Sequence, residues 1–155
     1  MITAWRVCKR RWVGGAFSGE GAAKYPGRWN RPGNRMVYLA ETRSLASLEV
    51  LAHTDDRSLL NHMDYVVIPV ILEDGHVLDL APGKLPANWA AIPTSDPTQR
   101  LGEKWLTDGA SVGLRVPSVV TKGEFSILLN PNHPDFKSLK IGAPEPYLFD
   151  NRIAR

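Results

Sequence analysis

The run from Tyr65 to Leu72, Tyr-Val-Val-Ile-Pro-Val-Ile-Leu, constrains the fold more than any other segment of the chain. Its β-branched residues follow one another too densely for a strand with one face in water, so the run predicts a buried strand. Pro69 has no N–H to donate to a neighbouring strand. We therefore expect the strand to be bulged, or to lie at a sheet edge, at this residue.

Two other segments have the periodicity and the end signals of helices. The first is expected to begin with Thr42 or Ser44 as its N-cap and to continue to His53, because either hydroxyl can accept a hydrogen bond from the first turn. The second is expected to run from about Pro97 to Thr107 and to end at the pair Asp108-Gly109.

Short strand patterns occupy much of the remaining chain. They are Thr3–Val7, Met36–Ala40, His76–Leu80, Gly113–Val116, Ser126–Asn130, Leu139–Ile141 and Tyr147–Phe149. Two helices among six or more short strands predict an α+β fold, with a compact mixed or antiparallel β core and a few helices. Because no repeat or linker divides the chain, we expect a single domain over residues 1–155.

Two stretches lack such a period and are predicted to be loops. Gly14–Gly33 is rich in glycine, and loops of about twenty residues without structure of their own often serve as lids or binding loops. Ala81–Pro97 is rich in proline and small residues, and Trp89 is expected to anchor it.

The composition predicts a soluble cytoplasmic protein. The chain has 155 residues, of which 43% are hydrophobic and 23% charged, enough for one proper core. No apolar run approaches the roughly 20 residues of a membrane helix, and the start resembles no signal peptide. Cys8 is the only cysteine, which excludes an intramolecular disulfide. Without a surrounding array of histidine and asparagine or aspartate, it is expected to be a buried or bystander thiol.

Positive charge gathers in the first part of the chain. Up to Arg43 there are nine lysines and arginines against two glutamates, a net charge of +7, while the remainder carries −4. Such a basic segment points to an anionic ligand, either a nucleic acid backbone or the phosphates of a small molecule. The alternative is a solvated basic surface.

Glu49 stands out within the first predicted helix. Turning by about 100° per residue from Leu45 places Leu48, Leu51 and Ala52 on one side of Glu49, and Ala46 and Val50 on its other side. The carboxylate thus falls inside the apolar face. It must be paired, hydrogen-bonded or open to a cleft, because burial alone would cost several kcal/mol. A structural arginine partner is the alternative to a functional role.

Several common site motifs are absent. The chain has no glycine fingerprint of the phosphate-loop or dinucleotide type, no His-Glu-x-x-His pair and no Gly-x-Ser-x-Gly elbow. Its histidines are dispersed singly, so no metal site is expected. They are His53, His62, His76 and His133.

Arginines, a tyrosine and a glutamate remain as candidate functional groups. Arginine can pair with a pyrophosphate, an aromatic ring can stack on a heterocycle, and a carboxylate can stabilise positive charge on a sugar. This set suits cleavage at the nicotinamide ribose of NAD. The same groups would also suit phosphodiester cleavage in RNA.

A series of short blocks, in one order across nearly the whole chain, resembles the RES domain. The blocks are Arg6 in Trp-Arg-Val, Gly27-Arg28-Trp29-Asn30, Val37-Tyr38-Leu39-Ala40, Ser44-Leu45-Ala46-Ser47-Leu48-Glu49, Val116-Pro117-Ser118 and Leu129-Asn130-Pro131-Asn132-His133-Pro134. The arginine, glutamate and serine for which the domain is named match Arg6 or Arg28, Glu49 and Ser118.

The resemblance implies a fold similar to ADP-ribosyltransferase toxins and a role as the toxin of a bacterial toxin–antitoxin pair. It implies NAD as the substrate and no metal, with cleavage of the nicotinamide–ribose bond as a glycohydrolase or phosphorylase, or transfer of ADP-ribose to a protein. The implied partner is an Xre-type helix-turn-helix antitoxin that covers the active site. Operator DNA would be contacted only through that complex, within which the toxin could form a homodimer.

The resemblance also assigns roles to residues. Carried over by position, Arg28, Tyr38 and Glu49 form the catalytic group, and Arg6, Ser118 and Asn130 bind the dinucleotide. Family members often carry an asparagine where this chain has Ser126, whose hydroxyl has a shorter reach. The alternatives are that Tyr38 belongs to the core and that Asn130-Pro131 is a turn.

Three functions from different classes follow. An NAD-degrading toxin is favoured by the ordered blocks and by Glu49. An RNA-cleaving toxin is suggested by the basic segment, which has no nearby histidine to act as a general base. A non-enzymatic module that binds nucleic acid would explain the charge, but the chain lacks a recognition-helix pattern.

Overall fold

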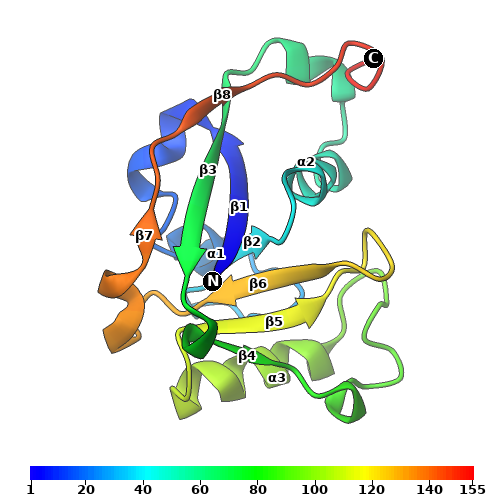
Figure 1. Cartoon of the computed structure of the whole chain (residues 1–155). Coiled ribbons are helices and arrows are strands. Elements are labelled where there is room, and N and C mark those ends of the chain that lie inside the picture. The colour runs from blue at the N-terminus through cyan, green and yellow to red at the C-terminus, as the bar shows by residue number, and fades with distance from the viewer.

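Eight strands form one sheet in the computed structural model, which describes residues 1–155 (Figure 1). They are β1 (Ile2–Lys9), β2 (Val37–Ala40), β3 (Tyr65–Leu72), β4 (Val77–Asp79), β5 (Gly113–Pro117), β6 (Phe125–Leu129), β7 (Lys140–Ile141) and β8 (Glu145–Tyr147). The order is β4-β5-β6-β2-β1-β3-β7, and β8 also pairs with β3. Only β4 and β5 run parallel, so the sheet is mixed and mainly antiparallel. The predicted α+β class is confirmed.

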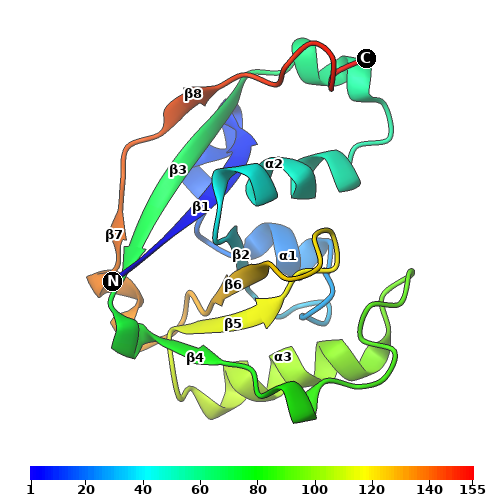
Figure 2. The ribbon, with the colours of Figure 1, turned by 45° about the vertical axis from the view of Figure 1, so that its right-hand side comes forward.

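Three α-helices accompany the sheet, namely α1 (Glu20–Lys24), α2 (Arg43–Ala52) and α3 (Asp96–Asp108). Short 3₁₀ helices occupy η1 (Arg10–Gly15), η2 (Arg57–Asn61), η3 (Asp74–His76), η4 (Pro82–Lys84) and η5 (Pro134–Ser138). Figure 2 shows α2 beside β1 and α3 beside β4 and β5. None of the helices is long and apolar enough to cross a membrane.

The two longer helices cover the same face of the sheet at two separate places. The core under α2 joins Leu45 to Ala40 and Val67, while the core on α3 joins Trp105 to Leu128. Strand register places Ala40, like Leu128, on one face of the sheet, because Ala40 pairs with Ser126 and lies two residues from the partner of Leu128. The central strand β2 therefore lies between two cores.

The sheet is nearly divided at its centre. β1 pairs with β3 along its whole length, but it meets β2 only where Trp5 faces Ala40. Arg6 crosses this seam, because its Nη1 donates a hydrogen bond to the carbonyl oxygen of Tyr38 at 3.0 Å. The seam separates a half that carries α2 from a half that carries α3.

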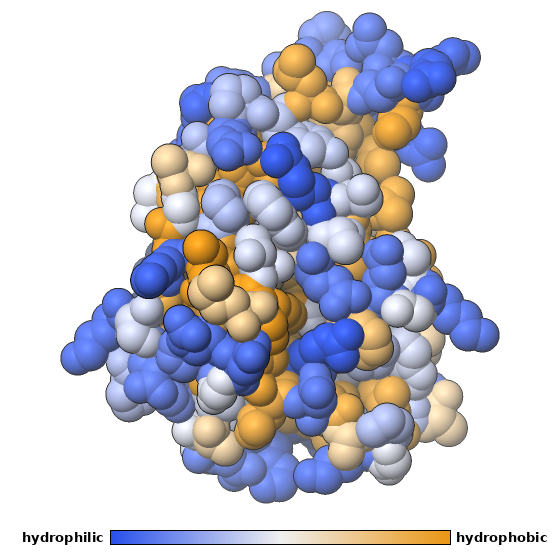
Figure 3. Space-filling model, in the orientation of Figure 1, coloured by the Kyte–Doolittle hydropathy of each residue, from blue (hydrophilic) through white to orange (hydrophobic).

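On the opposite face of the sheet, a third core joins both halves through Ala4, Leu39 and Val70. Figure 3 shows apolar residues at the surface in a band through the middle of this view, flanked by hydrophilic residues. Partly buried side chains of Ile2 and Phe136 pack against this third core.

Pro69 interrupts neither the strand nor its register. β3 pairs continuously with β1 through Pro69, so the expected bulge is absent. On the other side of β3, β8 ends its pairing at Val67 and β7 begins at Val70, so Pro69 faces the gap between them. Its carbonyl accepts a hydrogen bond from Gly142 at 2.8 Å. The missing N–H is thus tolerated at a local edge.

The prediction of one long loop over Gly14–Gly33 is wrong, because the segment contains the end of η1 and the whole of α1. Gly19 has a φ of 77° and allows the chain to turn closely against Met36, whose nitrogen would lie 2.8 Å from an added Cβ. Only glycine combines this backbone with this contact. The short α1 begins directly after it.

The remaining predicted elements are found with small shifts. Thr42 is the N-cap of α2, with its hydroxyl accepting from the Leu45 amide at 3.0 Å, and α3 ends at Asp108 with Gly109 as its C-cap, as predicted. The last strand ends at Tyr147, because Phe149 turns into the core beneath α2. Trp89 packs against the core on α3 and anchors its loop, and the thiol of Cys8 is buried, as expected.

Candidate active site

Glu49 lies on the buried side of α2 but has no strong partner. The buried arc of the helix contains Leu45 and Ala46 on either side of it, whereas Leu48 and Ala52 are exposed, contrary to their predicted place in the apolar face. The Glu49 side chain keeps 35% of its surface exposed, and its one ion-pair neighbour is the exposed His53 at 3.9 Å. No arginine lies within ion-pair distance of the carboxylate. Burial raises its pKa above the ordinary value.

Arg28 extends from the loop after α1 and is held only by neutral groups. Its Nη1 donates to the carbonyl oxygens of Trp89 at 2.9 Å and Ala91 at 2.8 Å. Burial lowers the pKa of Arg28, and the negative charge of Glu49 acts in the opposite direction. The charge of Glu49 influences the pKa values of both Arg28 and Tyr38, so the three side chains lie within electrostatic reach of one another.

Arg31, in the same loop, is paired with acidic residues and provides a comparison for Arg28. Its guanidinium contacts Asp96 at 2.7 Å and Glu103 at 3.4 Å, both on α3. Arg28 has no such acidic contact. Its charge therefore remains available to an anionic ligand.

Tyr38 lies on β2 between the two cores, and its hydroxyl is committed within the protein. The hydroxyl oxygen accepts from the Trp29 amide at 3.1 Å, and the hydroxyl donates to Oδ1 of Asn30 at 2.7 Å. Burial raises the pKa of Tyr38 far above the ordinary value, so the side chain stays neutral. The ring also packs partly against the core on α3, which agrees with the core interpretation as well.

Asn30 and Gly102 are residues of this region that the sequence did not single out. Asn30 is fully buried and bonds to Tyr38, as described above. Gly102 of α3 lies so close to the backbone of Trp29 that an added Cβ would overlap its carbonyl oxygen. Asn30 belongs to the same family-like block as Arg28, so the sequence pointed to this segment. The contacts of its side chain, however, form only when the loop is folded.

Arg6 and Ser118 differ in how they relate to this group. Arg6 donates to the Tyr38 carbonyl, its Nε is buried without a partner, and burial lowers the pKa of the guanidinium. Ser118 follows β5, and its buried Oγ accepts from the amides of Val120 and Thr121 at 3.1 Å. The Ser118 hydroxyl makes no hydrogen bond to the predicted catalytic residues.

Ser126 lies on the same face of the sheet as Tyr38. It pairs with Ala40 on one side and with Val116 on the other, and its side chain is partly exposed. The hydroxyl makes no hydrogen bond within the protein. Ser126 therefore faces the side of the sheet that bears the candidate site.

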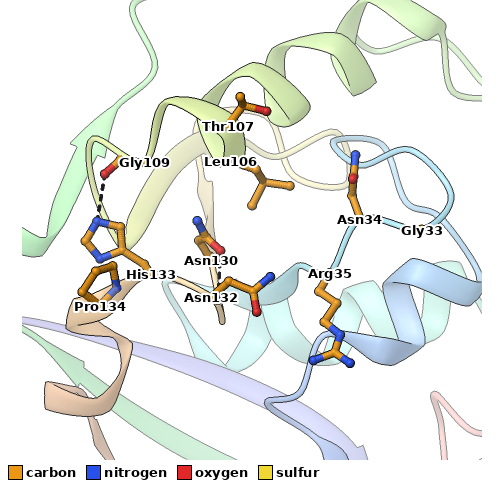
Figure 4. A pocket seen from close by; sticks show the side chains of 10 residues that line it. All are labelled: Gly33, Asn34, Arg35, Leu106, Thr107, Gly109, Asn130, Asn132, His133 and Pro134. Atoms are coloured by element: carbon orange, nitrogen blue, oxygen red, sulfur yellow. Dashed lines mark hydrogen bonds between the residues drawn. The ribbon is translucent and has the colours of Figure 1, made fainter.

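Asn130 lies at the opposite end of the β2–β6 pair. It follows Leu129, the partner of Val37, and its Oδ1 accepts from the Asn132 amide at 3.0 Å. The structure does not bring it to Arg28 and Glu49. It instead lines a hollow of about 390 Å³, formed by Gly33, Asn34, Arg35, Leu106, Thr107, Gly109, Asn130, Asn132, His133 and Pro134 (Figure 4).

Part of the basic segment forms a separate surface. A hollow of about 300 Å³ is lined by Lys9, Arg10, Arg11, His62, Met63 and Asp64. The cations of Lys9 and Arg11 lie 4.6 and 5.0 Å from the ring centroid of the half-exposed Trp12. The structure thus divides the predicted positive charge between this surface and the surroundings of Arg28.

Comparison with known sequences identifies a family. The profile of the RES domain matches residues 3–150. A protein named "Toxin Res" from Yersinia enterocolitica serotype O:8 / biotype 1B is 37% identical over 150 residues, which cover 96% of this chain and 97% of that protein. The "Prs ADP-ribosylating toxin" of Sphingobium sp. strain YBL2 is 35% identical, covering 97% and 96% of the two chains.

Comparison with solved structures supports the fold. A chain in the crystal structure of the M. tuberculosis MbcT–MbcA toxin–antitoxin complex superposes with a TM-score of 0.74 at 21% sequence identity. The match covers 95% of the present chain and 84% of the other chain. The two chains share their architecture, including a sheet with few helices.

Proposed function

Because this chain belongs to the RES domain family, we propose that it is the toxin of a toxin–antitoxin pair and that it cleaves the nicotinamide–ribose bond of NAD. The names of its relatives support the role of a toxin. The observation that carries the chemistry is the half-buried Glu49, whose carboxylate lies within the electrostatic range of Arg28 and has only an exposed histidine beside it.

Each of the three groups suits one part of such a reaction. Nη2 and Nε of Arg28 are not used within the protein and can bind phosphate oxygens of the dinucleotide. The Tyr38 ring offers a flat surface to the nicotinamide or ribose. As the bond to nicotinamide breaks and its electron pair leaves with the ring, Glu49 stabilises the positive charge on the ribose. Water or phosphate then donates an oxygen to the same carbon and releases a proton.

Arg6 and Ser118 have supporting roles in this proposal. Arg6 lies at the seam behind Tyr38 and adds positive potential to the site, although its Nη1 is used by the Tyr38 carbonyl. Ser118 fixes the turn between β5 and β6 and retains a hydroxyl hydrogen for a ligand. A cytoplasmic location follows for the proposed reaction, because it consumes the NAD of the cell.

The test is release of nicotinamide from NAD by the purified chain, measured with and without phosphate. We expect release by the wild type and a loss of about 100-fold or more in Glu49→Gln, because a charge aimed at the transition state is removed. Glu145→Gln, which changes an exposed carboxylate paired with Arg43, is the matched control and should cleave like the wild type. No loss of NAD at high wild-type concentration would rule the proposal out.

Transfer of ADP-ribose to a protein is a second candidate, favoured by the name of the Sphingobium relative. It would use the same bond cleavage with a protein side chain in place of water. Incubation with NAD labelled in the adenosine half distinguishes the two. Label retained on a protein after denaturation indicates transfer, whereas label recovered as free ADP-ribose indicates hydrolysis.

We further propose that an Xre-type antitoxin covers this site. Exposed apolar residues adjoin the catalytic group in sequence, since Leu48 precedes Glu49, Ile92 follows the carbonyl that holds Arg28, and Tyr25 lies at the start of the same loop. Ile92 and Tyr25 are 85% and 79% exposed, and apolar side chains around a polar site are typical of a surface that a protein partner covers. Operator DNA would be bound by that complex, in which two toxin chains could meet.

The partner proposal has its own test. The helix-turn-helix protein encoded beside the gene should copurify with the chain and suppress NAD cleavage. Ile92→Asp should weaken this suppression without reducing the cleavage itself. The control Leu148→Asp changes an exposed leucine on the C-terminal segment and should leave suppression intact. Equal suppression of all three chains would contradict the proposed docking surface.

A further inference from the structure

The side-chain amide of Asn30 forms hydrogen bonds through both its oxygen and its nitrogen. It is fully buried, and its Oδ1 accepts from the Gly27 amide at 2.9 Å and from the Tyr38 hydroxyl at 2.7 Å. Its Nδ2 donates to three carbonyl oxygens of the surrounding loop, those of Ala22, Arg31 and Asn34, at 2.8, 3.2 and 3.3 Å. The loop from α1 to β2 is therefore built around this one amide.

The Tyr38 hydroxyl connects the loop to the central strand. Its hydrogen is given to Asn30, and its oxygen accepts from the Trp29 amide. An added Cβ on Gly27 would lie 2.7 Å from the same oxygen, so the loop backbone is packed directly on the hydroxyl. No hydrogen of this hydroxyl is left for a substrate. The aromatic ring is the part of Tyr38 that remains for a ligand.

Arg28 lies between the two residues that this network holds. The amides of Gly27 and Trp29, one on each side of it, bond to Asn30 and to Tyr38. Gln99 of α3 adds a bond from its Nε2 to the Gly27 carbonyl at 3.1 Å. The backbone of Arg28 is thus fixed by the network, while its guanidinium is fixed by the carbonyls of the loop at Trp89.

We propose that Asn30 is a positioning residue, which sets the Arg28 guanidinium and the Tyr38 ring for the dinucleotide without touching it. The proposal rests on the proposed function for what those two side chains bind. It assigns to the Tyr38 hydroxyl the task of holding the loop, and not proton transfer to or from the substrate.

Kinetics of three variants test the assignment. In Asn30→Ala, kcat/KM for NAD should fall about 10- to 100-fold, mainly through a higher KM, because a displaced Arg28 binds poorly. Tyr38→Phe should lose about 3- to 10-fold and keep the wild-type pH profile, since one bond to Asn30 and one to Trp29 are removed. The double variant should be no worse than Asn30→Ala, because the partner is already absent. Asn132→Ala, an exposed asparagine of the distant hollow, is the matched control.

Amide hydrogen exchange provides a measurement that does not depend on activity. The Gly27 and Trp29 amides are bonded only to side chains, so their exchange should be slow in the wild type. Tyr38→Phe should speed the exchange of the Trp29 amide. Asn30→Ala should speed the exchange of the Gly27 amide as well. This comparison still decides the matter if Asn30→Ala folds poorly, because Tyr38→Phe leaves Asn30 in place.

Two results would overturn the assignment. One is a folded Asn30→Ala with wild-type kcat/KM. The other is a Tyr38→Phe variant whose pH profile is shifted while the Trp29 amide stays protected, since this would indicate proton transfer by the hydroxyl. If the wild type cleaves no NAD, the proposed function fails, whereas the exchange rates still show whether Asn30 holds the loop.

Discussion

The two ends of the β2–β6 pair differ in how their polar groups are satisfied. At the end beside Ala40, Glu49 has only an exposed histidine near it and Arg28 has only neutral carbonyls. At the other end, the ionisable groups that line the hollow near Asn130, Arg35 and His133, have partners within the protein. Both ring nitrogens of His133 are used, one by the Gly109 carbonyl at 2.9 Å and the other by the Asp135 amide at 3.1 Å.

This difference shows that the candidate catalytic groups, Arg28 and Glu49, do not lie in the hollow of about 390 Å³ near Asn130. A hollow whose charged groups are already paired offers volume, whereas half-buried charges without a charged partner retain free energy that a ligand can recover. The proposed site is therefore placed by charge and burial, and not by the size of a concavity. Four changes would break or sharpen this contrast.

Among these four tests, the largest effect is expected when the unpaired arginine is removed. Arg28→Ala should lower kcat/KM for NAD by about 100-fold, the scale of one or two charge-assisted hydrogen bonds to phosphate. Arg31→Ala is the matched control from the same loop, because its charge is already used by Asp96 and Glu103. Equal losses of kcat/KM in the two variants would show that the absence of an acidic partner does not identify the arginine that binds the dinucleotide.

Gly102→Ala should destabilise the end that bears the site by about 2–3 kcal/mol, the cost typical of overpacking. The added methyl group would overlap the Trp29 carbonyl, so the loop that carries Arg28 must move away from α3. Chemical denaturation measures the loss. Gly83→Ala, at a glycine with open space around it, is the control. A stable Gly102→Ala with full activity would contradict the close packing of this loop.

Glu49→Gln should change the dependence of stability on pH. Burial raises the pKa of Glu49, so the folded protein binds its proton more tightly than the unfolded chain does. The ionised carboxylate therefore lowers stability above its folded pKa, and this penalty vanishes below the unfolded pKa of about 4.3. Thermal unfolding should show Glu49→Gln above the wild type at pH 7, with the two converging toward pH 4. A constant difference would mean that the carboxylate carries no penalty.

The smallest effect is expected at the other end of the strands. Asn130→Ala should change kcat/KM for NAD by less than about 2-fold, while the lost turn bond to Asn132 costs about 1 kcal/mol of stability. A loss of cleavage comparable to that of Arg28→Ala would restore Asn130 to the dinucleotide site. The contrast between the two ends would then have to be abandoned.

The sequence predicted those elements whose signals are local. Tyr65–Leu72 is found with the predicted ends because its β-branched density is unmistakable, and the ends of α2 and α3 follow from Thr42 and Gly109. The five-residue α1 was missed, because Gly21 within it and the glycines around it hide a helix that depends on the turn at Gly19. The same limit explains β8, whose position depends on Phe149 entering a core.

The candidate site was predictable in part. Helical phase marked Glu49, but it did not show which flank of the helix meets the core, so Leu48 was misplaced. Arg28 and Tyr38 came from the family resemblance, and both lie within electrostatic reach of Glu49, while their catalytic roles stay predictions. Asn30 could not be recognised from its neighbours in sequence, because its role consists of bonds between segments that meet only after folding.

The single pairing of Trp5 with Ala40 has a mechanical consequence. Glu49 belongs to the half that contains β1 and α2, whereas the loop of Arg28 is bonded to α3 in the other half. The separation of carboxylate and guanidinium is therefore governed by the joint between two well-packed bodies. The hydrogen bond from Arg6 to the Tyr38 carbonyl oxygen links the two halves across that joint. Small adjustments there would be transmitted directly to the spacing of the two charges.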